Sequence, residues 1–128
     1  GDPETQAVLS RLDSDLFDIF NAVIDEKLED IEIRWADNAA CCVCMASGGY
    51  PKAYGKGKEI TGLSDVTGSF VFHAGTRLAD GKMLTDGGRV LGVTATAPTL
   101  DEAIRKAYAD VKKIHFDGAH YRTDIGVK

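Results

Sequence analysis

The stretch from Ser69 to Thr96 constrains the fold of this chain more than any other part of the sequence. Side-chain types alternate over residues 70–75, and a second run rich in β-branched residues covers 90–95. This pattern predicts two half-buried strands. Between them, segments 79–81 and 86–88 contain Asp and Gly, which tolerate positive φ, so we expect two turns. The sequence therefore predicts a central hairpin whose polar tip carries His73, Thr76, Thr85 and Arg89.

A polar tip of this kind is typical of a binding site on a rigid scaffold, and equally of an ordinary surface hairpin. The rest of the composition is that of a globular protein, because 44% of the 128 residues are hydrophobic and 27% are charged. The length suits one domain, or one domain with an appendage.

The net charge of -5 gives no electrostatic reason to expect a nucleic acid or an anionic membrane as partner. No apolar run approaches the roughly 18 to 20 residues that a membrane span needs, and the first residues lack the pattern of a secretion signal. We therefore expect a soluble, cytoplasmic protein.

Three cysteines, Cys41, Cys42 and Cys44, lie within four positions. A zinc site would need a second pair of cysteines or histidines farther along the chain, and the sequence has no such pair. On a strand, Cys42 and Cys44 would share one face and Cys41 would lie on the other. We expect all three to be reduced, small apolar residues of the core.

The amino-terminal residues predict two helices. Asp2 is a candidate N-cap, Pro3 suits the first helical position, and Glu4 lies in the first turn. Apolar residues then recur at intervals of three and four, which predicts helices over about 3–12 and 15–27. Because the sequence begins with glycine at this cap, we expect a segment of a longer chain whose other parts cover some of the apolar stripe.

Two strands should follow, over residues 31–35 with one wet face and over 39–47 with both faces buried. The glycine-rich, basic stretch 52–62 could contact phosphate or could be a solvated loop. It lacks the G-x-x-x-x-G-K-S/T pattern of a nucleotide-binding P-loop.

The last helix should begin after Thr99, an N-cap with Glu102 at the capping-box spacing. Its wet face is expected to carry Arg105, Lys106, Asp110, Lys112 and Lys113. We expect a short strand at 114–116, and neither His115 nor His120 has the spacing of a metal ligand. Together these elements predict an α+β fold: a mainly antiparallel sheet with a central hairpin and one packed helix, preceded by a helix pair.

Several blocks resemble one enzyme family. They are GDPETQ at 1–6, YPKAYGKGKEITGL at 50–63, FHAGT at 72–76, TDGGRVLGVTA at 85–95 and AYADVKKIHFDGAHYRTDIG at 107–126. In this order and spacing they resemble the carboxyl-terminal part of phosphoribosylamine-glycine ligase, also called glycinamide ribonucleotide synthetase. The resemblance covers nearly the whole chain.

The resemblance implies an ATP-grasp ligase of de novo purine biosynthesis, which uses ATP and magnesium to join glycine to 5-phosphoribosylamine. The family's metal-binding and ATP-gripping residues lie before GDPE, outside this chain. Residues 1–35 would then be the last helices of the ATP-grasp domain, and residues 36–128 the carboxyl-terminal domain. We expect no cofactor or metal bound to the fragment and no activity from it without the rest of the ligase. The alternative is a non-catalytic module that binds a protein through the 76–89 tip.

The resemblance also suggests which residues contact substrate. Asp2 and Glu4 match the GDPE motif, with helix capping and a dipole contact as their structural alternatives. Arg89 matches the arginine of GGRVL, which would reach a substrate carboxylate or phosphate, or else pair with a local carboxylate such as Asp86. His73 is expected to be a hydrogen-bonded structural residue. We expect no catalytic residue and no metal ligand in this chain.

Overall fold

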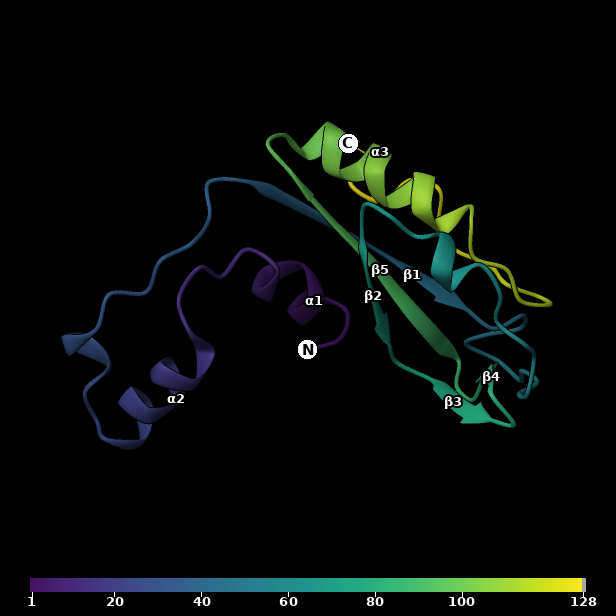
Figure 1. Ribbon diagram of the computed structural model, residues 1–128, viewed down its shortest axis with the longest axis horizontal. Helices are drawn as coiled ribbons and strands as arrows, with labels where there is room; N and C mark the ends of the chain where they lie inside the picture. The colour runs from purple at the N-terminus through teal and green to yellow at the C-terminus, as the bar shows by residue number, and fades with distance from the viewer. Residues whose placement is uncertain (128) are drawn as a thin grey trace.

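An antiparallel sheet organises the computed structural model, which describes residues 1–127 (Figure 1). Its strand order is β1 (Ala39–Ala46), β5 (Arg89–Ala97), β2 (Phe70–His73). The two strands of the expected central hairpin, β2 and β5, pair with Phe70 opposite Thr94 and His73 opposite Leu91. The α+β fold class and its mainly antiparallel sheet are therefore confirmed.

The tip of the central hairpin is a second, smaller hairpin. It consists of β3 (Thr76–Ala79) and β4 (Lys82–Thr85). Asp80 and Gly81 join these strands with φ values of 50° and 74°, the left-handed conformation expected from the sequence. The first of the two expected turns is therefore confirmed, at residues 79–81.

The turn at 86–88 uses glycine for a different reason from the one expected. Neither Gly87 nor Gly88 has a positive φ. Instead, the backbone crosses itself closely here, and a Cβ atom at Gly75 would lie 2.6 Å from both the Arg89 carbonyl oxygen and the Gly87 Cα. The Ser47 hydroxyl donates to the Gly87 carbonyl at 2.7 Å. Lack of a side chain, rather than conformational freedom, is what this turn requires.

The helix pair is present but shorter than expected. It consists of α1 (Glu4–Leu9) and α2 (Leu16–Ile24), and a 3-10 turn, η1 (Leu28–Asp30), follows. Asp15 caps α2 by accepting a hydrogen bond from the Phe17 amide at 2.8 Å. Asp2 makes no side-chain cap on α1, and Pro3 occupies the cap position instead of the first helical position. The expected cap by Asp2 is therefore wrong.

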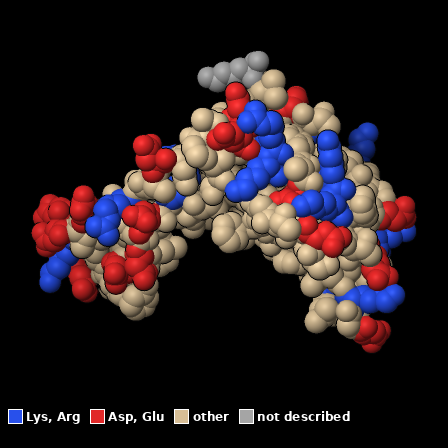
Figure 2. All heavy atoms as spheres, turned by 45° about the horizontal axis from the view of Figure 1, so that its top comes forward, with Lys and Arg blue, Asp and Glu red and all other residues tan. Residues whose placement is uncertain are grey.

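The apolar stripe of α2 stays uncovered within residues 1–127. Its exposed members are Phe17, Phe20, Val23 and Ile24. The sequence of this segment is rich in Asp and Glu, and Figure 2 shows many red and fewer blue side chains on the lobe at the left that contains α2. This lobe therefore combines exposed apolar side chains with many acidic ones.

Residues 31–35 do not form the expected strand. Trp35 makes only an isolated bridge to Leu12. The backbone of this stretch instead bonds to the linker after α1, with Asp13 donating to Arg34 at 3.0 Å and Ala36 donating to Arg11 at 2.8 Å. Alternation of side chains predicted a strand, but no neighbouring strand is available there. Instead, residues 11–14 and 34–36 of the same chain form a short ribbon of two hydrogen-bonded segments.

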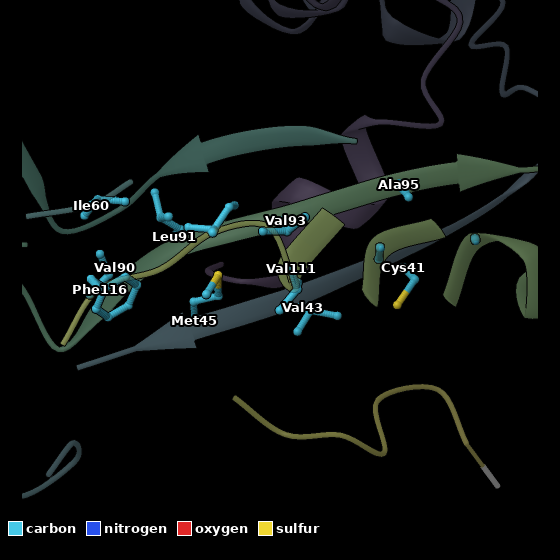
Figure 3. Close-up of a cluster of buried hydrophobic side chains, with 13 residues drawn as sticks. Cys41, Val43, Met45, Ile60, Val90, Leu91, Val93, Ala95, Val111 and Phe116 are labelled. Carbon is cyan, nitrogen blue, oxygen red and sulfur yellow. The ribbon is translucent and has the colours of Figure 1, made fainter. Parts of the chain in front are cut away.

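Helix α3 (Leu100–Val111) covers one face of β1 and β5. Thr99 caps it by accepting from the Glu102 amide at 3.3 Å, as the capping-box spacing predicted. Small residues, Ala103 and Ala107, allow the helix to approach the sheet closely. Figure 3 shows the resulting core, whose strand residues are Cys41, Val43, Met45, Val90, Leu91, Val93 and Ala95.

Asp110 does not lie on the wet face of α3, where the sequence placed it. Its side chain is only 3% exposed and accepts hydrogen bonds from the Gly68 amide at 2.9 Å and the Lys113 ammonium at 2.8 Å. The loop around η2 (Leu63–Asp65) thereby becomes fixed to the helix. At the end of the chain, the expected strand 114–116 is reduced to a bridge between Thr61 and His115.

Candidate functional site

An irregularity in the sheet decides which way Arg89 points. Val93 and Leu91 face the core under α3, so regular alternation would send Arg89 into the core too. The β1–β5 register shifts between Met45 and Ala46, and Val90 also joins the core. Two successive core residues reverse the alternation, so Arg89 emerges on the opposite face of the sheet.

Helix α1 lies against this opposite face. A Cβ atom added at Gly92 would touch Cys42 Sγ at 3.3 Å and Gln6 Cγ at 3.8 Å. The start of α1 thus stands beside the start of β5. The arrangement brings Asp2 and Arg89 together, although they are far apart in the sequence.

Asp2 and Arg89 form an ion pair. Arg89 Nη2 lies 3.0 Å from Asp2 Oδ2, and Asp2 Oδ1 accepts a hydrogen bond from Gln6 Nε2 at 2.9 Å. Both charged side chains remain about 40% exposed, so solvent reaches the pair. Asp86, the local partner considered from the sequence, pairs with Lys56 at 3.4 Å instead.

Glu4 is not part of this ion pair. Its side chain is exposed in the first turn of α1 and makes no hydrogen bond or ion pair with residues 1–127. The structure therefore joins Asp2 to Arg89 and leaves Glu4 nearby on the surface.

The cysteines divide between the two faces of β1 as the alternation predicted. Cys41 is buried under α3, whereas Cys42 and Cys44 are half-buried on the α1 face. The expectation that all three fill the core is therefore correct only for Cys41. Burial raises the pKa of each thiol, which keeps the sulfur protonated and weakly nucleophilic at neutral pH.

His73 and the basic loop have local partners. His73 Nδ1 lies 2.9 Å from the Thr76 hydroxyl, in agreement with the structural role expected for it. In the loop 52–62, Lys58 pairs with Asp117 at 2.9 Å. Thr85, expected at the polar tip, is fully buried, and its hydroxyl accepts from the Lys58 amide at 3.0 Å.

An open groove of about 840 Å³ runs between α1 and β2, next to the ion pair. Phe70 and Phe72 form its β2 wall, with ring centroids 6.3 Å apart. Thr5, Gln6 and Leu9 line the α1 wall. Sequence reasoning missed this groove, although aromatic residues at alternate positions of a short strand were a signal that could have pointed to it.

Comparison with known proteins identifies the family to which this chain belongs. Residues 40–128 match the family described as phosphoribosylglycinamide synthetase, C domain. The chain belongs to this family. The resemblance found in the motifs is thereby confirmed for the carboxyl-terminal domain of the synthetase.

Relatives of the synthetase match almost the whole chain. The phosphoribosylamine–glycine ligase of Clostridium acetobutylicum is 55% identical over 126 residues, which cover 98% of this chain and 30% of that protein. The ligase of Synechocystis sp. is 50% identical over 131 residues, covering all of this chain and 31% of the relative. The chain therefore spans about a third of the length of these relatives.

A solved structure has the same fold. The crystal structure of phosphoribosylamine–glycine ligase from Thermotoga maritima superposes with a TM-score of 0.78 at 37% identity. The match covers 98% of this chain and 31% of the crystallised one.

Within residues 1–127 no helix is long and apolar enough to cross a membrane.

Proposed function

We propose that this chain is the carboxyl-terminal part of a phosphoribosylamine–glycine ligase. The complete enzyme would join glycine to 5-phosphoribosylamine and convert ATP to ADP and phosphate, a step of purine biosynthesis. One observation carries the proposal: the 55% identity to a ligase over 98% of the chain. The three free cysteines support a cytoplasmic location, because reduced thiols are the rule there.

The proposed division of the chain places residues 1–35 with the ATP-grasp domain and residues 36–128 in a domain of their own. Two observations support this boundary. The family match begins at residue 40. In addition, α2 packs mainly on η1 and not on the sheet.

Arg89 is the substrate-binding residue that we propose with the strongest geometric support. Its planar guanidinium suits the carboxylate of glycine or a phosphate group, because it can donate two parallel hydrogen bonds. Its present partner, Asp2, is exposed, and solvent-exposed ion pairs contribute at most about 1 kcal/mol. An anionic substrate could therefore displace or share this partner at low cost.

Asp2 and Glu4 complete the proposed substrate contacts. Asp2 would orient Arg89, since it is itself held by Gln6. Glu4, exposed in the first turn of α1 two residues after Asp2, would accept a hydrogen bond from the amine or a hydroxyl group of the substrate. Neither residue is proposed to take part in proton transfer.

ATP and magnesium are the cofactors that we propose for the complete ligase, where the metal would offset phosphate charge. Residues 1–127 contain no group of three or more His, Cys, Asp or Glu side chains that could hold a metal ion. We therefore place no step of metal chemistry on this chain, and ATP is proposed to bind to the other part of the enzyme.

A chimera tests the proposal. This chain replaces the matched 126 residues of the C. acetobutylicum ligase, and ADP formation is measured with glycine and 5-phosphoribosylamine. We expect turnover by the chimera and none by the 128-residue chain alone. A folded chimera without turnover would overturn the proposed function, and turnover by the chain alone would overturn the proposed division of labour.

The role of Arg89 is tested in the same chimera. Arg89→Lys keeps the positive charge but loses the planar fork, so we expect at least about a tenfold loss of kcat/KM. Arg77→Lys, an exposed arginine of β3, is the matched control and should retain activity. Equal kinetics for both variants would make Arg89 a structural residue.

A further inference from the structure

The groove between α1 and β2 places exposed aromatic side chains next to one another in a hollow. Phe70 is 64% exposed and Phe72 is 39% exposed, and both face the groove together with Leu9. Scattered apolar residues on a surface need no explanation, but contiguous aromatic ones lining a hollow mark a contact site.

The strand that forms one wall has a free edge. In the sheet order β1-β5-β2, β2 pairs only with β5, and within residues 1–127 no strand pairs with its other side. Its sequence, FVFH, contains neither lysine nor proline, two residues that often protect an edge strand. Unpaired backbone groups next to aromatic side chains are the surface that accepts an added extended segment.

The electrostatics of the groove restrict its occupant. Asp2 is the only acidic residue that lines it, and the Asp2 carboxylate is already paired with Arg89. The remaining lining consists of apolar side chains and the polar groups of Thr5, Gln6, Ser10 and His73. A strongly charged segment would gain nothing here, whereas an apolar one would cover both phenylalanines.

We propose that this groove binds an apolar, extended segment from the part of the ligase that lies outside these 128 residues. The inference rests on the proposed function, because it takes its occupant from the ligase. The relatives supply the length, since the chain covers only 30% of the C. acetobutylicum ligase. Gly1 and Asp2 are among the residues that line the groove, so residues joined to Gly1 would start beside it.

The size of the groove favours a tethered occupant over a second copy of the chain. Independent proteins usually need about 1,200 Å² or more of buried surface to associate stably. A groove lined by nine residues offers much less. A segment of the same polypeptide can bind to a small site, because its effective concentration reaches the millimolar range.

Hydrogen exchange tests this inference directly. The backbone amides of 70–73 are compared in the isolated chain and in the chimera with the C. acetobutylicum ligase. We expect exchange of those amides of 70–73 that point away from β5 to be slowed at least about tenfold in the chimera, because the added segment pairs with this edge. The alternate amides, which bond to β5, are already protected and serve as an internal reference. Unchanged exchange would overturn the inference. Slowing in the isolated chain that appears only at high protein concentration would indicate a second copy and would also overturn it.

Substitutions locate the effect. Phe70→Thr combined with Phe72→Thr keeps strand-forming side chains but removes the apolar wall. We expect it to abolish the added protection in the chimera and to leave the isolated chain folded. Leu78→Thr is the matched control, because Leu78 is 70% exposed on β3 outside the groove. Equal effects of the two changes would contradict a specific site.

The result is separable from the proposed function. Slower amide exchange at 70–73 in a chimera without turnover would support the docking site and overturn the ligase function. Turnover by a chimera in which exchange at 70–73 is unchanged would support the ligase function and overturn the docking site. If the chimera does not fold, the same exchange measurement on the natural C. acetobutylicum ligase, over the segment aligned with 70–73, decides the question. Fast exchange there would overturn the inference.

Discussion

Arg89 is held in place by a carboxylate that is itself open to solvent. An exposed pair gains little Coulomb energy and must order two flexible side chains. We therefore expect the pair to contribute little to the stability of the fold. This contribution can be measured in the isolated chain, without any substrate.

We expect a double-mutant cycle of Asp2→Asn and Arg89→Gln to give a coupling energy below about 1 kcal/mol. Urea unfolding of the two single variants, the double variant and the unchanged chain supplies the four free energies. A coupling of about 3 kcal/mol would show that the pair stabilises the fold, and it would weaken the case for Arg89 as a substrate ligand.

Asp110 presents the opposite case, because it is buried. Burial alone would raise the pKa of this carboxyl, but the hydrogen bonds from Lys113 and from the Gly68 and Thr67 amides outweigh it and lower the pKa to about 2. An unperturbed aspartate carboxyl has a pKa of 3.8. A lowered pKa means that the folded state stabilises the charged form, so this stability is present above pH 4 and is lost as the pH falls toward 2.

Asp110→Asn should therefore reduce the free energy of unfolding by about 2 kcal/mol at pH 7 and flatten its decrease between pH 4 and pH 2. Urea titrations at several pH values provide the measurement. Asp37→Asn, at an exposed position, is the control and should change neither quantity by more than about 0.5 kcal/mol. A variant as stable as the original chain at pH 7 would contradict the role assigned to this network.

At the scale of elements, the local signals of the sequence were sufficient for some parts and not for others. Thr99 and Glu102 correctly predicted the start of α3, and Asp80-Gly81 correctly predicted the turn between β3 and β4. The shift in β1–β5 register at Val90 has no recognisable signature in the local sequence, yet this shift turns the Arg89 side chain away from the core. Burial of Asp110 also depends on a loop some forty residues away, which helix periodicity cannot report.

The crossing of the 73–76 and 86–89 segments gives an element-scale prediction. Gly75→Ala places a methyl group against the backbone of Arg89 and Gly87, which cannot move as a flexible side chain would. We expect a loss of about 1 to 3 kcal/mol in the free energy of unfolding, measured by urea titration. Gly55→Ala is the matched control, because nothing lies within 4 Å of its added Cβ. Equal free energies of unfolding for the two variants would mean that the backbone at the crossing shifts to accommodate the methyl group, and would contradict this prediction.

At the scale of the whole molecule, the α2 lobe and the sheet should unfold separately. The lobe is joined to the rest through the ribbon of residues 11–14 and 34–36, and its apolar face is uncovered. Trp35, the only tryptophan, lies in this ribbon and reports on it. We expect its fluorescence to change at lower urea concentration than the circular dichroism signal of the sheet and α3.

A core substitution checks that assignment. Val111→Ala removes packing between α3 and the sheet, so it should move the second transition to lower urea and leave the tryptophan transition in place. Two transitions that coincide in both proteins would contradict separate unfolding.

The pairing of β1 with β5 has a consequence for synthesis of the chain. Ala39 pairs with Ala97 and Met45 with Leu91, so β1 leaves the ribosome well before its neighbour exists. Contacts between such distant positions form slowly, because a long loop must close first. Until β5 is made, the nascent cysteine-rich strand β1 lacks its native partner, and its exposed apolar side chains are a site where chaperones would bind.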